Sequence, residues 1–136
     1  MTNLFSLEGK NAWVTGACYG IGFAIAKAFA KAGANHIIFN ARSQEAIDKA
    51  YELYRAEGIT NAHGYVCDVT DEKAVKALVE QIHAEVGPID ILVNNAGIIK
   101  RIPMHEMKRE EFQQVIDIDL VAPYIVSAAV LWRSQP

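Results

Sequence analysis

Residues 14–34, VTGACYGIGFAIAKAFAKAGA, place a glycine-rich turn between a short apolar run and a long amphipathic segment. The run before the turn, residues 11–15, has the length and composition of a buried strand. From Ile21 onward apolar residues recur at helical spacing, and Gly33 ends the pattern. The stretch therefore predicts a strand, a bare-backbone turn and a helix, in that order.

The glycines of this turn are Gly16, Gly20 and Gly22. Gly16 permits a tight turn, Gly20 lets the backbone approach a ligand, and Gly22 lets the helix pack close to the strand. Backbone N–H groups at a helix N-terminus form an anion site suited to a pyrophosphate, so we expect nucleotide binding here. A purely structural turn is the alternative. The spacing differs from that of a P-loop, because no lysine follows the last glycine.

Strands and helices alternate along the rest of the chain. The expected strands are 36–41, 63–69 and a fourth at the start of IDILVNNAG (89–97); the expected helices are one capped by Ser43 and closed by Gly58, one within 70–87 and one from Arg109 onward. Such alternation predicts an α/β fold with a parallel sheet covered by helices on both faces. With right-handed crossovers, residues 1–136 form the first half of a Rossmann-type doubly wound sheet, truncated after the fourth strand and the following helix.

The composition is that of an ordinary globular domain, with 51% hydrophobic and 21% charged residues. A net charge of -3 argues against nucleic acid as a partner. The two cysteines, Cys18 and Cys67, fit no zinc pattern, so we expect reduced thiols and no metal. The N-terminus lacks the features of a signal peptide, and the apolar runs are too short to span a bilayer. We therefore expect a cytoplasmic protein with no membrane partner.

Polar residues also stand where two further strands of the predicted sheet end. Asp68 lies at the end of the third strand, and Asn94 and Asn95 lie at the end of the fourth. Ligands of open α/β sheets bind outside these carboxyl ends. Local roles are the alternatives, namely a helix cap for Asp68 and a turn for the asparagines.

The chain resembles the short-chain dehydrogenase/reductase family over nearly its whole length. The glycine turn reads TGxxxGIG, the stretch CDVT at 67–70 is similar to the family's adenine-site aspartate motif, and NNAG at 94–97 is similar to the motif after its fourth strand. The resemblance implies a nicotinamide dinucleotide cofactor and oxidoreductase activity. The residues expected to bind the cofactor are Gly16, Tyr19, Gly20, Ile21, Gly22, Arg42, Asp68, Val69, Asn95, Ala96 and Gly97.

The end of the second strand distinguishes NADP from NAD. An acidic residue about 20 positions after the glycines holds the ribose 2′-hydroxyl of NAD, and Ala41 stands at that position here. Arg42 follows, and a guanidinium can hold a 2′-phosphate through parallel hydrogen bonds, to which Asn40 and Ser43 can add donors. These residues favour NADP. NAD is the alternative, with Arg42 solvated or stacked on the adenine.

Asp119 is the candidate catalytic residue of the last helix. It falls on one apolar face with Phe112, Val115 and Ile116, where a carboxylate needs a partner. Pro123 has no N–H, so the Asp119 carbonyl loses its helical partner and the helix is expected to kink. The resemblance aligns Asp119 with the asparagine of the family's Asn-Ser-Tyr-Lys set, whose main-chain carbonyl holds a water in a proton relay. A partnered structural aspartate is the alternative.

The stretches NNAGIIKRIPM and VIDIDLVAPYIVS, with the YGIGFAIA turn, are most similar to the gluconate 5-dehydrogenase branch of the family. That resemblance implies a sugar acid as substrate, interconverting gluconate and 5-ketogluconate, usually with NADP. Lys100 and Arg101 follow NNAG closely, and either cation can bind a carboxylate. Solvated loop charges are the alternative for both.

The family's catalytic tyrosine and lysine are not found, because no tyrosine of the chain has a lysine four residues later. Three hypotheses follow: the cofactor-binding half of an NADP-dependent sugar-acid dehydrogenase, a dinucleotide-binding fragment that catalyses nothing, or an unstable fragment that binds nothing. The simplest explanation for the missing tyrosine and lysine is that the chain is a truncated or frame-shifted gene product. The fourth strand is then expected to be an exposed sheet edge, and the last helix, which helps form the subunit interface of homo-oligomeric full-length relatives, to lack its cover.

Overall fold

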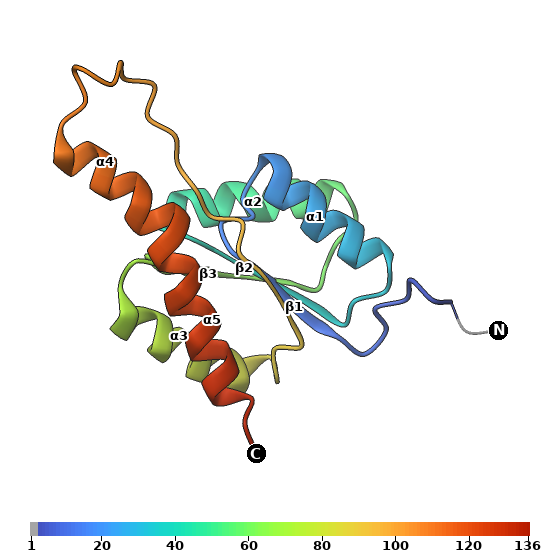
Figure 1. Ribbon diagram of the computed structural model, residues 1–136. Helices are drawn as coiled ribbons and strands as arrows, with labels where there is room; N and C mark the ends of the chain where they lie inside the picture. Colours follow the sequence, from blue (N-terminus) through green and yellow to red (C-terminus); the bar gives the residue numbers. More distant parts are fainter. Residues whose placement is uncertain (1–2) are drawn as a thin grey trace.

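Four strands form one parallel sheet in the order β3-β2-β1-β4 in the computed structural model, which describes residues 3–136 (Figure 1). The strands are β1 (Asn11–Val14), β2 (His36–Ala41), β3 (Ala62–Val66) and β4 (Ile91–Val93). In the register of the sheet, Trp13 of β1 stands between Ile38 of β2 and Leu92 of β4. The chain moves outward from β1 to β3 and then crosses back to β4, so the strand order reverses between β1 and β4. A ligand crevice is expected at this reversal.

Helices cover both faces of the sheet, as predicted. They are α1 (Gly20–Lys31), α2 (Gln44–Ala56), α3 (Glu72–Glu85), α4 (Arg109–Ile116) and α5 (Ala122–Arg133), with a π-helical segment η1 (Asp117–Val121) between the last two. Figure 1 shows α1 and α2 on one side of the strands and α3 and α5 on the other. The chain thus has the predicted α/β architecture, with a four-stranded Rossmann-like sheet.

The two faces of the sheet build two apolar cores, because successive side chains of a strand point to opposite sides. Trp13 and Ile38 pack with residues of α3 and α5, whereas Val14, Ile37 and Phe39 pack with residues of α1 and α2. All five side chains are fully buried. A strand buried on both faces reads as a continuous apolar run, which is why the sequence predicted a parallel sheet.

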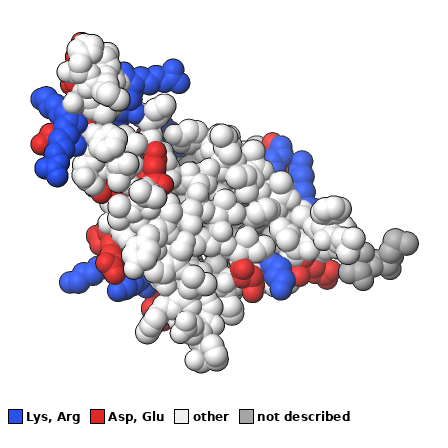
Figure 2. Space-filling view, viewed as in Figure 1, with Lys and Arg blue, Asp and Glu red and all other residues white. Residues whose placement is uncertain are grey.

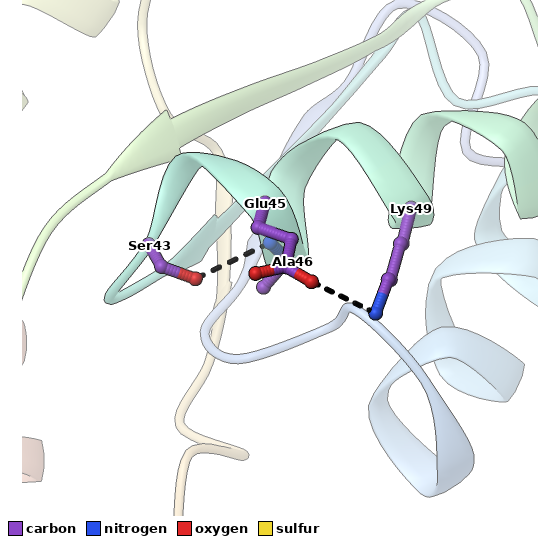
Figure 3. A network of polar contacts seen from close by, with 4 residues as sticks. All are labelled: Ser43, Glu45, Ala46 and Lys49. Carbon is purple, nitrogen blue, oxygen red and sulfur yellow. Dashed lines mark hydrogen bonds and ion pairs between the residues drawn. The ribbon is translucent and has the colours of Figure 1, made fainter.

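The ends of α2 follow the predicted capping pattern, and α3 has a capped start as well. The Ser43 hydroxyl accepts a hydrogen bond from the Ala46 N–H at 3.2 Å in the first turn of α2, which also carries Glu45 of the exposed Glu45–Lys49 ion pair (Figure 3). Asp71 caps α3 in the same way, through the Ala74 N–H at 3.1 Å. Gly58, at a φ of +75°, ends α2 in a conformation that residues with a side chain rarely adopt.

The third strand is shorter than predicted and ends at Val66 rather than Val69. Its partner β2 ends at Ala41, which pairs with Val66, and a last bond joins the Cys67 N–H to the Ala41 carbonyl at 2.8 Å. Beyond this point β2 offers no backbone partner. Residues 67–69 therefore leave the sheet as a loop.

The last helix widens into a π-helical turn where a kink was expected. The Ala122 N–H bonds to the Asp117 carbonyl, five residues back, and Pro123 follows at once without an N–H to donate. The wider turn shifts the helix faces, so Ile118, Ala122 and Val126 form the buried face. The prediction that Asp119 lies on the buried apolar face of this helix is therefore wrong, because Asp119 is exposed.

The helix Arg109–Arg133 is long and apolar enough to cross a membrane by length and composition alone, because an 18-residue window within it has a mean hydropathy of 1.8. The expectation that the apolar segments are too short is therefore wrong for this helix. Core helices of globular proteins meet the same criterion. Here α5 packs on α3, and the Arg133 guanidinium pairs with Glu80 of α3 at 3.0 Å.

Candidate functional site

A cleft of about 570 Å³ opens at the carboxyl ends of the strands. The glycine turn, the end of β2, the loop after β3 and the loop after β4 all contribute to its wall. Every residue predicted to bind the cofactor lines it: Gly16, Tyr19, Gly20, Ile21, Gly22, Arg42, Asp68, Val69, Asn95, Ala96 and Gly97. Four segments separated along the sequence thus converge on one cavity.

The glycine turn exposes a row of backbone donors to this cleft. Gly16 and Gly20 adopt φ values of +66° and +63°, which favour glycine. Within residues 3–136, the N–H groups of residues 18–22 have no hydrogen-bond acceptor from the protein. Free donors at the start of α1, together with the dipole of the helix, suit a pyrophosphate.

The glycine turn and the NNAG loop interlock. A side chain at Gly16 would place its Cβ 3.1 Å from the Ala96 Cα. A Cβ at Gly22 would overlap the amide of Asn95 and lie 3.0 Å from the Ala17 Cα. Glycine is therefore required at both positions by the close approach of neighbouring segments, which is a packing reason beyond access for the ligand.

Thr15 is a site residue that the sequence reasoning missed. Its buried hydroxyl oxygen accepts from the N–H groups of Asn95 and Ala96, both at 3.0 Å. The Asn95 side-chain amide donates in return to the Thr15 carbonyl at 3.0 Å. The only sequence signal is the threonine that begins TGxxxGIG. Thr15 fixes the NNAG loop against β1, so Asn95 combines a structural role with its place in the cleft wall.

Asn40 lines the cleft wall and also has a structural role that the sequence did not predict. Its buried side-chain oxygen accepts from the Trp13 indole N–H at 3.1 Å and from the Gly16 N–H at 3.2 Å. Its side-chain amide donates to the Cys67 carbonyl at 3.3 Å. Because both ends of the amide are engaged, Asn40 joins the ends of β1, β2 and β3 below the cleft.

Arg42 and Ser43 remain available at the cleft wall beyond β2. The Ser43 oxygen accepts the capping N–H of α2, which leaves its hydroxyl proton free to donate. The Arg42 guanidinium lies near enough to Asp68 to help lower the pKa of that carboxyl. The two charged side chains therefore face one region of the cleft.

Asp68 has both a local and a cleft-facing role. One carboxylate oxygen accepts from the Thr70 hydroxyl at 2.7 Å and from the Thr70 N–H at 3.0 Å. The Thr70 hydroxyl contributes most to holding the pKa of Asp68 below its usual value. The cap of α3 is Asp71, so the alternative of a helix cap for Asp68 is not what the structure shows.

The predicted catalytic and substrate residues lie outside the cleft wall. The Asp119 carboxylate accepts the Ile98 N–H at 2.9 Å, which ties η1 to the loop after β4. A Cβ at Gly97 would come within 3.1 Å of the same oxygen. Lys100 is half-buried and Arg101 is exposed in the segment before α4. Asp119 thus has a hydrogen-bond partner although it is exposed.

Five wall residues were not predicted by the sequence reasoning: Cys18, Ala46, Cys67, Ile98 and Ile118. Burial raises the pKa of the Cys18 thiol, and burial with the nearby Asp68 and Asp71 raises the pKa of Cys67 to about 11. Both cysteines are therefore protonated thiols at neutral pH. The two thiols form an apolar part of the cleft wall and do not act as nucleophiles.

A parallel sheet with a glycine turn, a free helix N-terminus and a cleft at the strand reversal defines a dinucleotide-binding α/β fold. The chain matches the family described as short chain dehydrogenase over residues 10–133. It therefore belongs to the short-chain dehydrogenase family.

The relatives include sugar-acid enzymes as well as enzymes named for sugar alcohols, such as the D-threitol dehydrogenase of Mycolicibacterium smegmatis. The chain is 51% identical over 129 residues to 2-dehydro-3-deoxy-D-gluconate 5-dehydrogenase of Formosa agariphila, covering 95% of this chain and 48% of the relative. It is 43% identical over 134 residues to gluconate 5-dehydrogenase of Gluconobacter oxydans, covering 98% of this chain and 52% of the relative. The chain therefore spans about half the length of the relatives it matches.

Solved structures agree with this placement. The structure of 2-keto-3-deoxy-D-gluconate dehydrogenase from Streptococcus agalactiae is 64% identical, with a TM-score of 0.82 over 93% of this chain and 47% of that one. A gluconate 5-dehydrogenase from Burkholderia cenocepacia, in complex with NADP and tartrate, is 36% identical, with a TM-score of 0.84 over 95% of this chain and 50% of that one. The fold of the chain thus matches about half of each of these structures.

Proposed function

We propose that this chain is the cofactor-binding half of an NADP(H)-dependent oxidoreductase that interconverts a hydroxyl and a keto group on a sugar acid. The observation that carries the proposal is the convergence of all eleven predicted cofactor residues on one cleft. The free N–H groups of residues 18–22 are suited to the pyrophosphate. Asp68 and Val69 are suited to the adenosine end of the cofactor, in keeping with the family resemblance.

NADP is the proposed cofactor because of the charge at the end of β2. Ala41 offers no carboxylate to a ribose 2′-hydroxyl, and the Arg42 guanidinium beside it lines the cleft. A guanidinium is suited to a phosphate through parallel hydrogen bonds. The Burkholderia cenocepacia relative crystallised with NADP supports this choice. NAD is the alternative that the binding experiment distinguishes.

The proposed substrate is a six-carbon sugar acid that reacts at position 5. Relatives named as 5-dehydrogenases of gluconate and of 2-dehydro-3-deoxy-D-gluconate support this class. Lys100 and Arg101 are proposed to attract or bind the carboxylate. Figure 2 shows Lys and Arg side chains gathered over the segment before α4 and the start of α4, where Lys108 and Arg109 add to them.

When bound, the cofactor supplies or accepts the hydride. This chain contributes binding and positioning: the turn donors orient the phosphates, and Asp119 holds the Ile98 peptide in place. Asp119 is proposed as the counterpart of the family's catalytic asparagine through its main-chain carbonyl. The proton step needs the family's Tyr-x-x-x-Lys, which this sequence does not contain. A second candidate follows for the chain alone, namely dinucleotide binding without turnover.

The apolar surface of the last helix suggests self-association of the complete protein. Leu120, Tyr124, Leu131 and Trp132 are between 65% and 74% exposed. A groove of about 400 Å³ lies beside them, between α3 and α5. We propose that a second copy of the complete protein covers this face in a homo-oligomer. We also propose that the protein is cytoplasmic.

Isothermal titration of the purified chain with NADPH and NADH tests the proposal. We expect saturable binding, tighter for NADPH. Equal affinities would contradict the role of Arg42, and no binding of either dinucleotide would contradict both candidate functions. Turnover of gluconate or 2-dehydro-3-deoxygluconate with NADP by the chain alone would rule out the binding-only candidate.

A further inference from the structure

A tyrosine from α2 that does not line the cleft is hydrogen-bonded to the glycine turn. The Tyr54 hydroxyl donates to the Ala17 carbonyl at 2.8 Å, across 37 positions of sequence. Tyr54 is 1% exposed, and its ring lies 4.9 Å from the rings of both Phe23 and Phe39. Phe23 belongs to the first turn of α1, so one side chain contacts both the turn and the start of the helix. No step of the proposed function uses this hydroxyl.

The Tyr54 hydroxyl stays protonated, so it can always donate its hydrogen bond. Burial, and secondarily the neighbouring Cys18, raise the pKa of Tyr54 well above its usual value. The hydroxyl therefore keeps its proton at any physiological pH. Ala17 is itself fully buried, so its carbonyl would lack a partner without this bond.

The bond fixes the direction of a donor in the cleft wall. In a trans peptide the carbonyl of one residue and the N–H of the next point in opposite directions. Holding the Ala17 carbonyl toward α2 therefore turns the Cys18 N–H away from α2. The same peptide is restrained on its far side, because the Cys18 thiol donates to the Asn40 carbonyl at 3.6 Å. Rotation of this peptide would instead present the Ala17 carbonyl oxygen, which repels phosphate.

We propose that Tyr54 is a positioning residue for the pyrophosphate: it holds the Ala17–Cys18 peptide so that the turn presents N–H groups, not a carbonyl, to the cofactor. This inference rests on the proposed function. It assigns to α2, which supplies the cleft wall only with Ala46 and the capping Ser43, a second role in cofactor binding. The ring of Tyr54 fills the core, and the hydroxyl alone carries the proposed role.

The chain offers a matched control on the same helix. The Tyr51 hydroxyl, one turn earlier, accepts the Gly64 N–H of β3 at 2.6 Å, and its ring lies 5.3 Å from Phe39. Tyr51 does not line the cleft. Tyr54→Phe and Tyr51→Phe therefore each remove one backbone-bonded hydroxyl and keep the ring, but only Tyr54→Phe frees the glycine turn.

The test compares NADPH with 2′-AMP, which has the adenine and the 2′-phosphate but no pyrophosphate. For Tyr54→Phe we expect NADPH affinity to fall about three- to tenfold, the effect of one hydrogen bond, with 2′-AMP affinity within about twofold of the unaltered chain. For Tyr51→Phe both affinities should stay within about twofold. An equal effect of the two substitutions on NADPH, or an equal loss of NADPH and 2′-AMP for Tyr54→Phe, would overturn the proposal.

Amide NMR spectra of the unliganded variants report on the glycine turn itself, separately from any change in the overall stability of the fold. We expect the signals of residues 17–22 to shift or broaden in Tyr54→Phe and to stay in place in Tyr51→Phe. Unchanged signals in Tyr54→Phe would overturn the positioning role even if binding weakened. Failure of the unaltered chain to bind NADPH at all would instead overturn the proposed function, and with it the role of Tyr54.

Discussion

The side-chain amide of Asn95 occupies the space that a Cβ at position 22 would need. One residue belongs to the loop after β4 and the other to the first turn of α1, so the packing of these two segments depends on a missing side chain. The same amide donates to the Thr15 carbonyl, which keeps it in that place. The glycine turn and the NNAG loop consequently behave as one unit of the cleft.

Gly22→Ala should disrupt this unit. The new Cβ would lie 2.9 Å from the Asn95 Cγ and 3.0 Å from the Ala17 Cα, so one segment must move. We expect a loss of about 1–3 kcal/mol in the free energy of unfolding, measured by urea titration. NADPH affinity should fall at least about tenfold. Gly9→Ala is the control. At a φ of +78° the new side chain strains the backbone but contacts no neighbour, and Gly9 lies away from the cleft. NADPH affinity should therefore be retained in this variant.

Thr15→Val should separate the loop from β1 with little change in shape. The valine cannot accept the N–H groups of Asn95 and Ala96, and each buried donor left without an acceptor destabilises the fold by about 1–3 kcal/mol. Thr15→Ser keeps the hydroxyl oxygen and should stay close to the unaltered chain in thermal unfolding. Equal melting temperatures for the valine and serine variants would show that these bonds contribute nothing.

Arg42→Ser should remove the preference for NADPH. Hydrogen bonds to charged groups contribute about 1.5–3 kcal/mol, so NADPH affinity should fall by about tenfold or more while NADH affinity changes little. Fluorescence titration of both reduced dinucleotides measures the two constants. A parallel loss for NADPH and NADH would indicate that Arg42 contacts the adenine or the fold and not a 2′-phosphate.

The free energy of unfolding should depend on pH through a pair of histidines at the starts of β2 and β3, at the end of these strands away from the cleft. The Nε2 of His63 and the Nδ1 of His36 lie 3.0 Å apart. Burial first, and His36 second, lower the pKa of His63, while Glu85 opposes them. The unfolded chain, with a histidine pKa of about 6.5, then binds a proton more readily than the folded one, so stability should fall as pH drops below about 6.5.

Melting temperatures between pH 8 and pH 5 measure this effect, with His63→Gln as the comparison. The variant should lose part of the slope below about pH 6.5. An identical slope in both proteins would assign the pH dependence to other groups. Neither histidine lines the cleft, so NADPH affinity at pH 8 should be unaffected in the variant.

The sequence predicted the parts of the site that local chemistry determines. Spacing located the glycine turn, the strand ends pointed to Asp68 and Asn95, and the family resemblance supplied Val69, Ala96 and Gly97. The element order predicted the sheet, because alternating strands and helices leave few topologies. The bounds of β2 agree with the prediction to the residue, since Asn35 and Arg42 flank a continuous run.

The sequence did not predict contacts between distant segments. Thr15 meets Asn95 across 80 positions and Tyr54 meets Ala17 across 37, and no local pattern encodes either pair. The end of β3 depends on where its neighbour β2 stops. The buried face of α5 depends on the π-helical turn at Asp117–Val121, which shifts the helical period on which the prediction relied.

The most direct test of cofactor binding in this cleft is to map NADPH on the chain by amide chemical-shift perturbation. We predict that NADPH shifts four groups of signals: those of residues 16–22, of Ala41 to Ser43, of Asp68 and Val69, and of Asn95 to Gly97. Signals of the groove between α3 and α5 should stay in place. Saturable shifts confined to that groove, or none in the glycine turn, would contradict the proposed site.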